Sequence, residues 1–405
     1  MVAGIADTSL CTQFLIAFGI PTADGGITYP DLSPFKRLRT PNSKLLLAIG
    51  GADKVSDKNF PLLAANHRGG FAQNCLNIIR NEGLDGVDID WEYPKEDTQN
   101  KTNFVLLMQE LRNKLGSNYI LSTAVATGAW RVEKSYDIPA LTPLVNYFNL
   151  MAYDFHADDG SWDLDWSVPG ETKPHYGVYF NAPVNGPGDT VESGIKLFRE
   201  TFNVPANKLN LGVPFYARVY KLKNAWNTAP KSECYLDNQE NFKDTYMPSY
   251  NDYCAALTNS AYTKVRDPTT LAPYMYNSSG FWISYEDQRS ITVKANLANK
   301  YELGGVMLWA LNQDDFDGSC GNYCQWSLLK TLNYVVGRKT SYCYGPPQRT
   351  TCPSAGYFAD PTDCRKAYVC NGAGQAPIQG WCNEPFFFSE AGQNCVPECQ
   401  AKFTN

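Results

Sequence analysis

The sequence of 405 residues has little of several features that would place it in familiar classes of protein. No apolar run reaches the roughly 18 residues that a membrane-spanning helix needs, so we expect no membrane partner. The net charge of −6 argues against nucleic acid or an anionic membrane surface as a partner. Only three histidines occur, and no zinc-ligand spacing includes them, so we expect no metal site.

The beginning of the chain also lacks the pattern of a secretion signal. Residues 1–20 contain no basic segment followed by an apolar core. The 13 cysteines nevertheless indicate an oxidising compartment, because six of them lie between Cys352 and Cys399, a density typical of small secreted domains. We therefore expect a secreted, extracellular protein and interpret this chain as a mature or truncated form.

The most informative segment is the octet Asp-Gly-Val-Asp-Ile-Asp-Trp-Glu at residues 85–92. Alternate side chains of a strand share a face, so Asp88, Asp90 and Glu92 are predicted to line one face, with apolar residues on the other. Burial and mutual repulsion would keep at least one of these carboxyls protonated, which is the state that a general acid needs. The alternative is a solvated acidic edge strand. The interleaved apolar residues, and the absence of Lys and Arg among them, favour the buried strand.

The octet resembles the signature of glycoside hydrolase family 18, Asp-x-x-Asp-x-Asp-x-Glu, in its chitinase form, and Tyr93-Pro94 continues the match. The resemblance implies that Glu92 protonates the glycosidic oxygen and later activates water. It implies that Asp90 hydrogen-bonds the acetamido group of the sugar, while Asp88 tunes Asp90. Asp85 has the opposite strand parity, so we interpret it as structural.

A nucleophile must still be found. Asp90 and Glu92 are successive residues on one face and approach a sugar from the same side, so Asp90 is badly placed to attack opposite Glu92. The family's solution is substrate assistance, in which the 2-acetamido oxygen of the sugar attacks and configuration is retained. That mechanism confines substrates to N-acetylated amino sugars.

Further segments match the same family. Asn-Leu-Met-Ala-Tyr-Asp at residues 149–154 implies that Tyr153 is a catalytic hydrogen-bond donor to the acetamido oxygen. Two of the implied residues also have a structural interpretation, since Met151 and Trp309 on barrel strands would be ordinary core side chains. The resemblance implies that six residues bind substrate, namely Phe18, Met151, Asp154, Tyr216, Arg218 and Trp309.

Short apolar runs alternate with helical patterns, which predicts an α/β fold with a parallel sheet. Helices are expected over 70–83 and 103–115. The pattern favours a (β/α)8 TIM barrel, but we count seven strands, and comparison with the family indicates that the first one is missing. This would leave Cys11 without its family partner. The alternatives are a naturally rearranged barrel or one misassigned strand. The runs are Phe14–Gly19, Leu45–Gly51, Gly86–Glu92, Tyr119–Thr127, Tyr147–Asp154, Leu209–Arg218 and Gly304–Asn312.

The chain is expected to hold two domains. The catalytic barrel is predicted over 1–335, with a small α+β insertion at about 219–280 that the family also has. Residues 336–351 are interpreted as a linker. In the insertion, the resemblance implies a disulfide between Cys254 and Cys320.

The tail at residues 352–399 is too short to bury much core, so disulfides must supply its stability. Its segments resemble a peritrophin-A type chitin-binding module, a small β-type domain. A generic disulfide-stapled module is the alternative. The family's pairing would give Cys352–Cys370, Cys364–Cys399 and Cys382–Cys395.

The sequence therefore predicts a secreted, monomeric chitinase without a cofactor, acting on chitin and chito-oligosaccharides. The C-terminal module would hold the enzyme on the insoluble polymer. The first alternative is a chitinase-like lectin that binds without cleaving, although such relatives typically lose the acid that Glu92 provides. The second is an endo-β-N-acetylglucosaminidase that acts on glycoprotein glycans.

Overall fold

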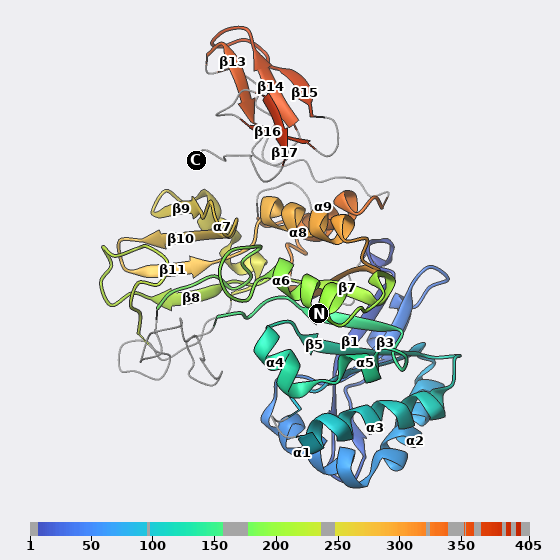
Figure 1. The fold of residues 1–405 in the computed structure, drawn as a ribbon. Helices are drawn as coiled ribbons and strands as arrows, with labels where there is room; N and C mark the ends of the chain where they lie inside the picture. Colours follow the sequence, from blue (N-terminus) through green and yellow to red (C-terminus); the bar gives the residue numbers. More distant parts are fainter. Residues whose placement is uncertain are drawn as a thin grey trace. The chain divides into compact units, whose positions relative to one another are not determined.

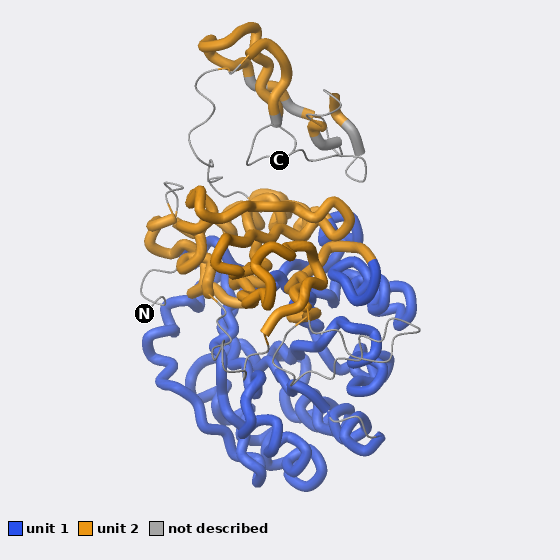
Figure 2. Tube along the Cα trace, turned by 90° about the vertical axis from the view of Figure 1, so that its left-hand side faces the viewer, with its two compact units in different colours: residues 1–153, 187–213, 297–308 blue, residues 154–186, 214–296, 309–405 orange. Residues whose placement is uncertain are grey.

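The computed structural model describes ten stretches of the chain, and these divide into two compact units (Figure 2). Unit 1 comprises residues 1–153, 187–213 and 297–308, and unit 2 comprises residues 154–186, 214–296 and 309–405. The described residues are 7–94, 98–156, 177–235, 248–320, 325–338, 352, 354–359, 366–382, 386–389 and 394–397.

The sheet of unit 1, of which β1, β3, β5 and β7 are labelled in Figure 1, is predominantly parallel. Its strand order is β12-β7-β6-β5-β4-β3-β1-β2. Six strands pair in parallel in the order β1-β3-β4-β5-β6-β7. Strand β12 adjoins β7, and the short β2 pairs antiparallel with the end of β1. The strands are β1 (Gln13–Pro21), β2 (Ile27–Thr28), β3 (Lys44–Gly50), β4 (Gly86–Asp90), β5 (Ile120–Ala126), β6 (Tyr147–Met151), β7 (Leu209–Pro214) and β12 (Gly305–Trp309).

The helices of the first half of the chain follow the strands, as the crossover connections of a parallel sheet require. Helices α1, α2 and α3 contact one another and also strands of the sheet. Trp91 lies between them, with ring centroids 5.2 Å from Phe60 of α1 and 5.6 Å from Phe104 of α3. The helical elements are η2 (Thr8–Leu10), η3 (Ser33–Leu38), α1 (Lys54–Asn66), α2 (Arg68–Glu82), α3 (Thr98–Leu115), α4 (Ala129–Ser135), α5 (Ile138–Leu141), α6 (Val191–Lys196), the π-helical η4 (Leu197–Thr201) and η5 (Ala206–Lys208).

The predicted fold class is confirmed as a TIM-barrel-like curled sheet, and the sheet is open within the described residues. Its order begins with β12 and ends with β1 and β2, so β1 and β12 are not paired there. The two end strands are less buried than the middle of the sheet. All five residues of β12 are half-buried, whereas all five residues of β4 are buried.

Unit 2 contains the α+β insertion, an antiparallel sheet in the order β8-β11-β10-β9. Its core is aromatic, with Trp282 stacked on Tyr274 at 4.8 Å and packed against Phe180 and Tyr220. Helix α8 runs from unit 2 into unit 1. The elements are β8 (Arg218–Lys221), α7 (Tyr250–Thr258), β9 (Tyr262–Arg266), β10 (Pro273–Asn277), β11 (Phe281–Ser284), α8 (Gln288–Lys300), η6 (Leu311–Gln313) and α9 (Ser327–Val335).

One predicted run is divided. The stretch Leu209–Arg218 was expected as a single strand, but β7 ends at Pro214 and Arg218 begins β8 in the other sheet. Proline has no N–H to continue a strand ladder, which accounts for the end of β7 at this residue. The next N–H, that of Phe215, donates instead to the carbonyl of Trp309 at 2.8 Å.

The C-terminal segment is β-type and carries disulfides. Its strands form two antiparallel sheets, β13-β14-β15 and β16-β17. The disulfides Cys254–Cys320, Cys352–Cys370 and Cys382–Cys395 are formed, and these are pairings that the resemblance implies. Cys364 and Cys399, the remaining implied pair, lie outside the described residues. The strands are β13 (Gly356–Ala359), β14 (Lys366–Cys370), β15 (Ile378–Trp381), β16 (Phe386–Ser389) and β17 (Asn394–Pro397).

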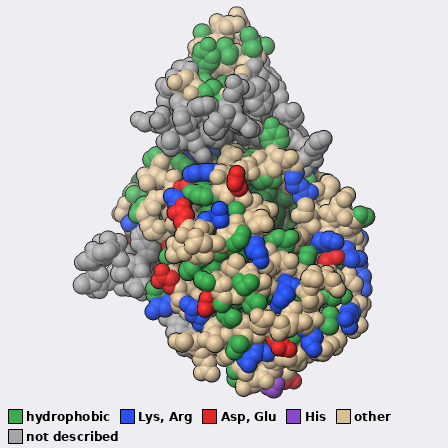
Figure 3. Space-filling view, turned by 45° about the vertical axis from the view of Figure 1, so that its right-hand side comes forward, with side chains coloured by type: hydrophobic (Ala, Val, Ile, Leu, Met, Phe, Trp, Pro, Cys, Tyr) green, Lys and Arg blue, Asp and Glu red, His purple; other side chains and the backbone are tan. Residues whose placement is uncertain are grey.

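On the face of the molecule seen in Figure 3, Lys and Arg side chains are interspersed with Asp, Glu and apolar side chains. Among the described helices, none combines the length and the apolar character that a membrane crossing requires.

Candidate active site

Strand β4 presents the carboxylates in the alternation that the sequence predicts. Asp88 is 1% exposed and Asp90 is 6% exposed, and Glu92 follows the strand end as a half-buried residue. Ile89 and Trp91 between them are fully buried, Trp91 against the helices. Asp88 and Asp90 therefore lie within the sheet rather than on a solvated edge, because β4 has a parallel neighbour on each side.

Asp88 is held by polar side chains from the next two strands. Its Oδ1 accepts hydrogen bonds from Ser122 Oγ at 2.5 Å and from Asn149 Nδ2 at 2.9 Å. Asn149 Oδ1 accepts in turn from Asn210 Nδ2 at 3.0 Å. Burial raises the pKa of Asp88 to about 6, although both hydrogen bonds act in the opposite direction.

Asp90 shares its environment with Glu92. Burial raises the pKa of Asp90 well above its ordinary value, and the charges of Glu92 and Asp88 and a hydrogen bond with Glu92 raise it further. Asp90 Oδ1 is buried and has no hydrogen-bond partner among the described residues. The Asp90–Glu92 pair therefore retains a proton at a pH where an ordinary Asp is ionised.

Two consecutive glycines allow this arrangement. Gly50 has φ +121°, and a Cβ there would lie 1.9 Å from the carbonyl oxygen of Asp90. Gly51 has φ +89°, and a Cβ there would lie 2.7 Å from the ring of Phe18. Side chains at these positions would separate β3 from β4 and displace Phe18, so only glycine fits.

The remaining predicted residues of unit 1 also lie at carboxyl ends of strands. Met151 ends β6 and is 8% exposed, and its carbonyl accepts from Thr127 Oγ1 at 3.1 Å. Tyr153 follows as a half-buried residue, and its hydroxyl lies 4.0 Å from the sulfur of Met307 on β12. Phe18, near the end of β1, is half-buried. This is the end of the parallel strands where enzymes of this architecture build their sites.

In unit 2, three predicted residues form one cluster. Asp154 Oδ1 accepts from Tyr216 Oη at 2.7 Å, from Arg218 Nη2 at 2.6 Å and from Arg218 Nε at 3.1 Å. Burial alone would lower the pKa of Arg218, but the charge of Asp154 outweighs it and raises that pKa. Trp309, also predicted to bind substrate, is the half-buried last residue of β12.

Sequence reasoning missed the polar residues that support the acids. Ser122 lies opposite Asp88 in the register of β4 and β5, and Asn149 lies opposite Asn210 in that of β6 and β7. The signal was present, because each is a polar residue inside an apolar run. Tyr136 was also missed. Burial raises its pKa well above the ordinary value, and the charges of Glu92 and Asp90 contribute to the rise.

Asp85 has a separate environment. It forms a bidentate ion pair with Arg39, at 2.9 and 3.0 Å, and accepts the N–H of Leu45 at 2.9 Å. Burial alone would raise the pKa of Asp85, but the hydrogen bond from Arg39 and the other contacts lower it. These contacts join the start of β4 to the start of β3 and give Asp85 the structural surroundings expected from its parity.

No group of three or more His, Cys, Asp or Glu side chains in the described part of the chain is arranged to hold a metal ion. Carboxyls with raised pKa values at the carboxyl end of a curled parallel sheet are groups that a glycoside hydrolase can use for acid–base catalysis. Comparison with known proteins agrees with this class. The family model of glycosyl hydrolases family 18 matches residues 2–314, and the chain therefore belongs to this family.

Similar proteins include chitinases. The chain is 30% identical over 348 residues to Probable chitinase 2 of Drosophila melanogaster, covering 78% of this chain and 68% of that protein. It is 30% identical over 339 residues to a Probable endochitinase of Caenorhabditis elegans, covering 77% of this chain and 53% of that protein. The crystal structure of Ostrinia furnacalis Group IV chitinase in complex with allosamidin superposes with a TM-score of 0.73 at 28% identity, covering 82% of this chain and 93% of that one.

Proposed function

We propose that this protein is a chitinase that hydrolyses β-1,4 bonds between N-acetylglucosamine residues, with retention of configuration. The observation that carries the proposal is the hydrogen-bonded pair of Asp90, buried at the end of β4, and Glu92, half-buried two residues beyond it, in which the pKa of Asp90 is raised. A glycosidase needs a carboxylic acid that holds its proton near neutral pH, and this pair supplies one.

Glu92 is the proposed general acid. It is the most exposed of the three acids and lies just beyond the strand end, where a polymer can reach it. Its proton passes to the glycosidic oxygen as the C1–O bond breaks. The sugar's acetamido oxygen bonds to C1 from the opposite side and forms an oxazolinium ion. Glu92, now a carboxylate, then takes a proton from the water that attacks C1, and the bond between C1 and the acetamido oxygen breaks, which restores the acetamido group.

Asp90 and Asp88 are proposed to support the cationic intermediate. Asp90 has a buried Oδ1 without a described partner, and the acetamido N–H of the substrate would satisfy it. Asp88 holds a proton up to about pH 6, so its ionisation state changes the charge that Asp90 meets. Tyr153 is proposed to donate to the acetamido oxygen. No cofactor or metal takes part in these steps.

The other predicted residues are proposed to bind sugar. In unit 1 these are Phe18 and Met151. In unit 2 the Asp154 carboxylate, oriented by Tyr216 and Arg218, is suited to sugar hydroxyls and amides. Trp309 offers a half-buried indole, which suits the apolar C–H face of a pyranose.

The domain organisation is also a proposal. We place the catalytic region at 1–335, the linker at 336–351 and a peritrophin-A type chitin-binding module at 352–399. The two described disulfides of the tail are compatible with this module and with a secreted, extracellular protein. A monomer that binds chitin and chito-oligosaccharides is the proposed working form, with neither nucleic acid nor membrane as a partner.

The alternatives make different use of the site. A chitinase-like lectin would not need Glu92, and the presence of this acid beside Asp90, whose pKa is raised, favours hydrolysis. An endo-β-N-acetylglucosaminidase would need no chitin-binding tail.

Substrate assistance is tested by comparing chitohexaose with cellohexaose, which differ in the 2-acetamido group. We expect chitohexaose to be hydrolysed and cellohexaose to be inert, because glucose carries no internal nucleophile. A thiazoline analogue of the oxazolinium ion should inhibit competitively. Comparable hydrolysis of both oligomers would refute the proposal.

A further inference from the structure

The backbone of Asp154 adopts a conformation that few residues tolerate. Its φ is +56°, in the left-handed region, where Asp is several times more frequent than most residues but still uncommon. Such a conformation persists only where the surroundings hold it. The carboxylate of Asp154 is held by Tyr216 and Arg218, as described above. Its backbone therefore needs contacts of its own.

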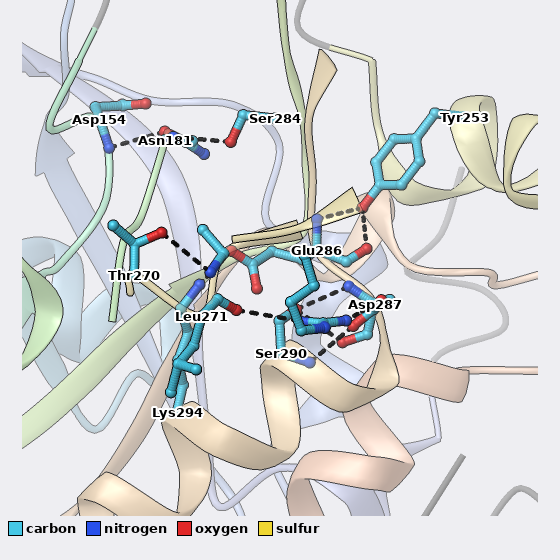
Figure 4. A network of polar contacts seen from close by, with 12 residues as sticks. Asp154, Asn181, Tyr253, Thr270, Leu271, Ser284, Glu286, Asp287, Ser290 and Lys294 are labelled. Atoms are coloured by element: carbon cyan, nitrogen blue, oxygen red, sulfur yellow. Dashed lines mark hydrogen bonds and ion pairs between the residues drawn. The ribbon is translucent and has the colours of Figure 1, made fainter. Parts of the chain in front are cut away.

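Asn181 supplies those contacts. Its side-chain Oδ1 accepts the N–H of Asp154 at 2.9 Å, and its main-chain carbonyl accepts the N–H of Phe155 at 3.1 Å. Two consecutive donors of the left-handed turn are thus bound by a single residue. Figure 4 shows Asn181 between Asp154 and Ser284.

Asn181 is itself fixed in place. It is 2% exposed within the apolar stretch from Val178 to Val184, and its main-chain N–H donates to Ser284 Oγ at 2.9 Å. Ser284 on β11 is the cross-strand neighbour of Arg218 on β8. The same two strands therefore anchor the partner of the Asp154 carboxylate and the partner of its backbone.

The carbonyl end of the Asn181 amide makes the contact. Its Nδ2 is buried and has no hydrogen-bond partner among the described residues. An Asp at this position would keep the acceptor and would lose no described hydrogen bond, whereas a Leu of similar size would remove the acceptor.

We infer that Asn181 is a positioning residue, which fixes the direction in which the Asp154 carboxylate meets the sugar. The inference rests on the proposed function, because it gives Asp154 the role of contacting substrate. Asn181 is 2% exposed, and its described side-chain hydrogen bond is with the N–H of Asp154. It acts through the backbone of Asp154.

The first test compares Asn181→Leu with Thr270→Val. Thr270 is a matched control in the same unit, since it is 4% exposed and its hydroxyl donates to Asp267 Oδ1 at 2.9 Å without a described contact to Asp154. Asn181→Leu removes one side-chain hydrogen bond, and Thr270→Val removes two, because the Thr270 hydroxyl also accepts from the N–H of Ala272 at 3.4 Å, so both variants should lower Tm. We expect kcat/KM on chito-oligosaccharides to fall by on the order of tenfold to a hundredfold only in Asn181→Leu, because misplacement of a substrate contact costs rate. Equal activity loss in the two variants would overturn the inference.

A double-mutant cycle with Asp154→Asn separates positioning from general destabilisation. Asn also tolerates the left-handed region, so this change removes the charge while the turn is kept. If Asn181 acts through the Asp154 carboxylate, adding Asn181→Leu to Asp154→Asn should change kcat/KM by less than about threefold. Additive losses would show that Asn181 acts elsewhere.

The conservative variant Asn181→Asp provides the rescue. The buried carboxyl beside Asp154 is expected to have a raised pKa, so the variant should approach parental kcat/KM as pH falls and lose it as pH rises. Asn181→Leu should remain low at every pH, and an Asp variant equally impaired throughout would contradict the inference.

Binding of chitohexaose by Glu92→Gln proteins separates failure of this inference from failure of the proposed function. Weaker binding on adding Asn181→Leu, but not Thr270→Val, supports the inference without any turnover. If chitohexaose binds and both additions behave alike, the inference fails while the proposed function stands. If the unsubstituted protein, which retains Glu92, neither binds nor cleaves chitohexaose, the proposed function fails and the inference fails with it.

Discussion

At the residue scale, the pKa values of the acids depend on burial, on neighbouring charges and on the hydrogen bonds that each carboxyl accepts. β4 places two Asp side chains in surroundings that disfavour ionisation, and neighbouring strands supply Ser122 and Asn149 as hydrogen-bond donors to only one of them. Asp88 is thereby partly compensated, whereas Asp90 is left with the charge of Glu92. The difference explains how adjacent carboxyls of one strand can take different roles.

The ionisation of Asp88 should make stability depend on pH. An unfolded Asp has a pKa near 3.8, and the folded value is about 6, so the folded protein keeps a proton that the unfolded chain releases in between. Rising pH therefore lowers the free energy of unfolding over this window, by on the order of 3 kcal/mol for this group, and has no further effect through it above about pH 6. Asp88→Asn keeps a side-chain oxygen that can accept the hydrogen bonds from Ser122 and Asn149. This variant should reduce the dependence of the free energy of unfolding on pH in this window. Urea unfolding at about pH 4 and pH 7 measures it, and an unchanged slope would contradict the assignment.

The sequence allowed the acids to be predicted but not their partners. Strand parity alone places Asp88, Asp90 and Glu92 on one face, because the period of two is a local property. Which residue lies opposite Asp88 depends on the register between β4 and β5, and no local pattern specifies that register. Asn181 was missed for a similar reason, since a single polar residue in an apolar stretch does not indicate what it contacts.

At the scale of elements, the strands of the sheet differ in their surroundings. β4 is paired on both sides and fully buried, while β12 is paired with β7 and is half-buried along its length. β1 has an exposed residue, Ala17, within an apolar strand. The seven apolar runs were predictable because strands buried on both faces are nearly continuous in apolar residues. The division at Pro214 was not predicted, because the run continues through it in apolar character.

Hydrogen exchange should show this difference between strands. We expect the amides of β12 to exchange at least about tenfold faster than those of β4, since a strand with one described partner opens more easily than a strand with two. Mass spectrometry of peptides that cover 86–90 and 305–309 measures both in one sample. Equal protection of the two strands would show that the β12 edge is covered in solution.

At the scale of the whole molecule, the first 335 residues and the C-terminal tail rely on different sources of stability. The first 335 residues contain extended apolar cores, while the tail is held by Cys352–Cys370 and Cys382–Cys395 around a small cluster that includes Phe388. The cysteine spacing made a disulfide module predictable, because a chain of about fifty residues cannot bury enough core without such links. The pairing was not derivable from spacing, since six cysteines allow fifteen connectivities.

Removal of residues 346–405 should separate the hydrolysis of soluble chito-oligosaccharides from binding to chitin particles. We expect kcat/KM on soluble chito-oligosaccharides to stay within about twofold, and binding to chitin particles to fall by about tenfold or more, because the tail supplies an additional contact with the polymer. Pull-down on chitin beads and a soluble fluorogenic assay measure the two effects. Equal losses in both assays would indicate that the tail stabilises the catalytic region instead.

The central claim is that Glu92 delivers the proton that breaks the glycosidic bond. Glu92→Gln tests it most directly, because the amide keeps the size of the side chain and cannot donate that proton. Turnover and affinity are measured together on chitohexaose. The account predicts that turnover falls by at least about a hundredfold while affinity is largely unchanged. Turnover within about tenfold of the parent would remove Glu92 from this role.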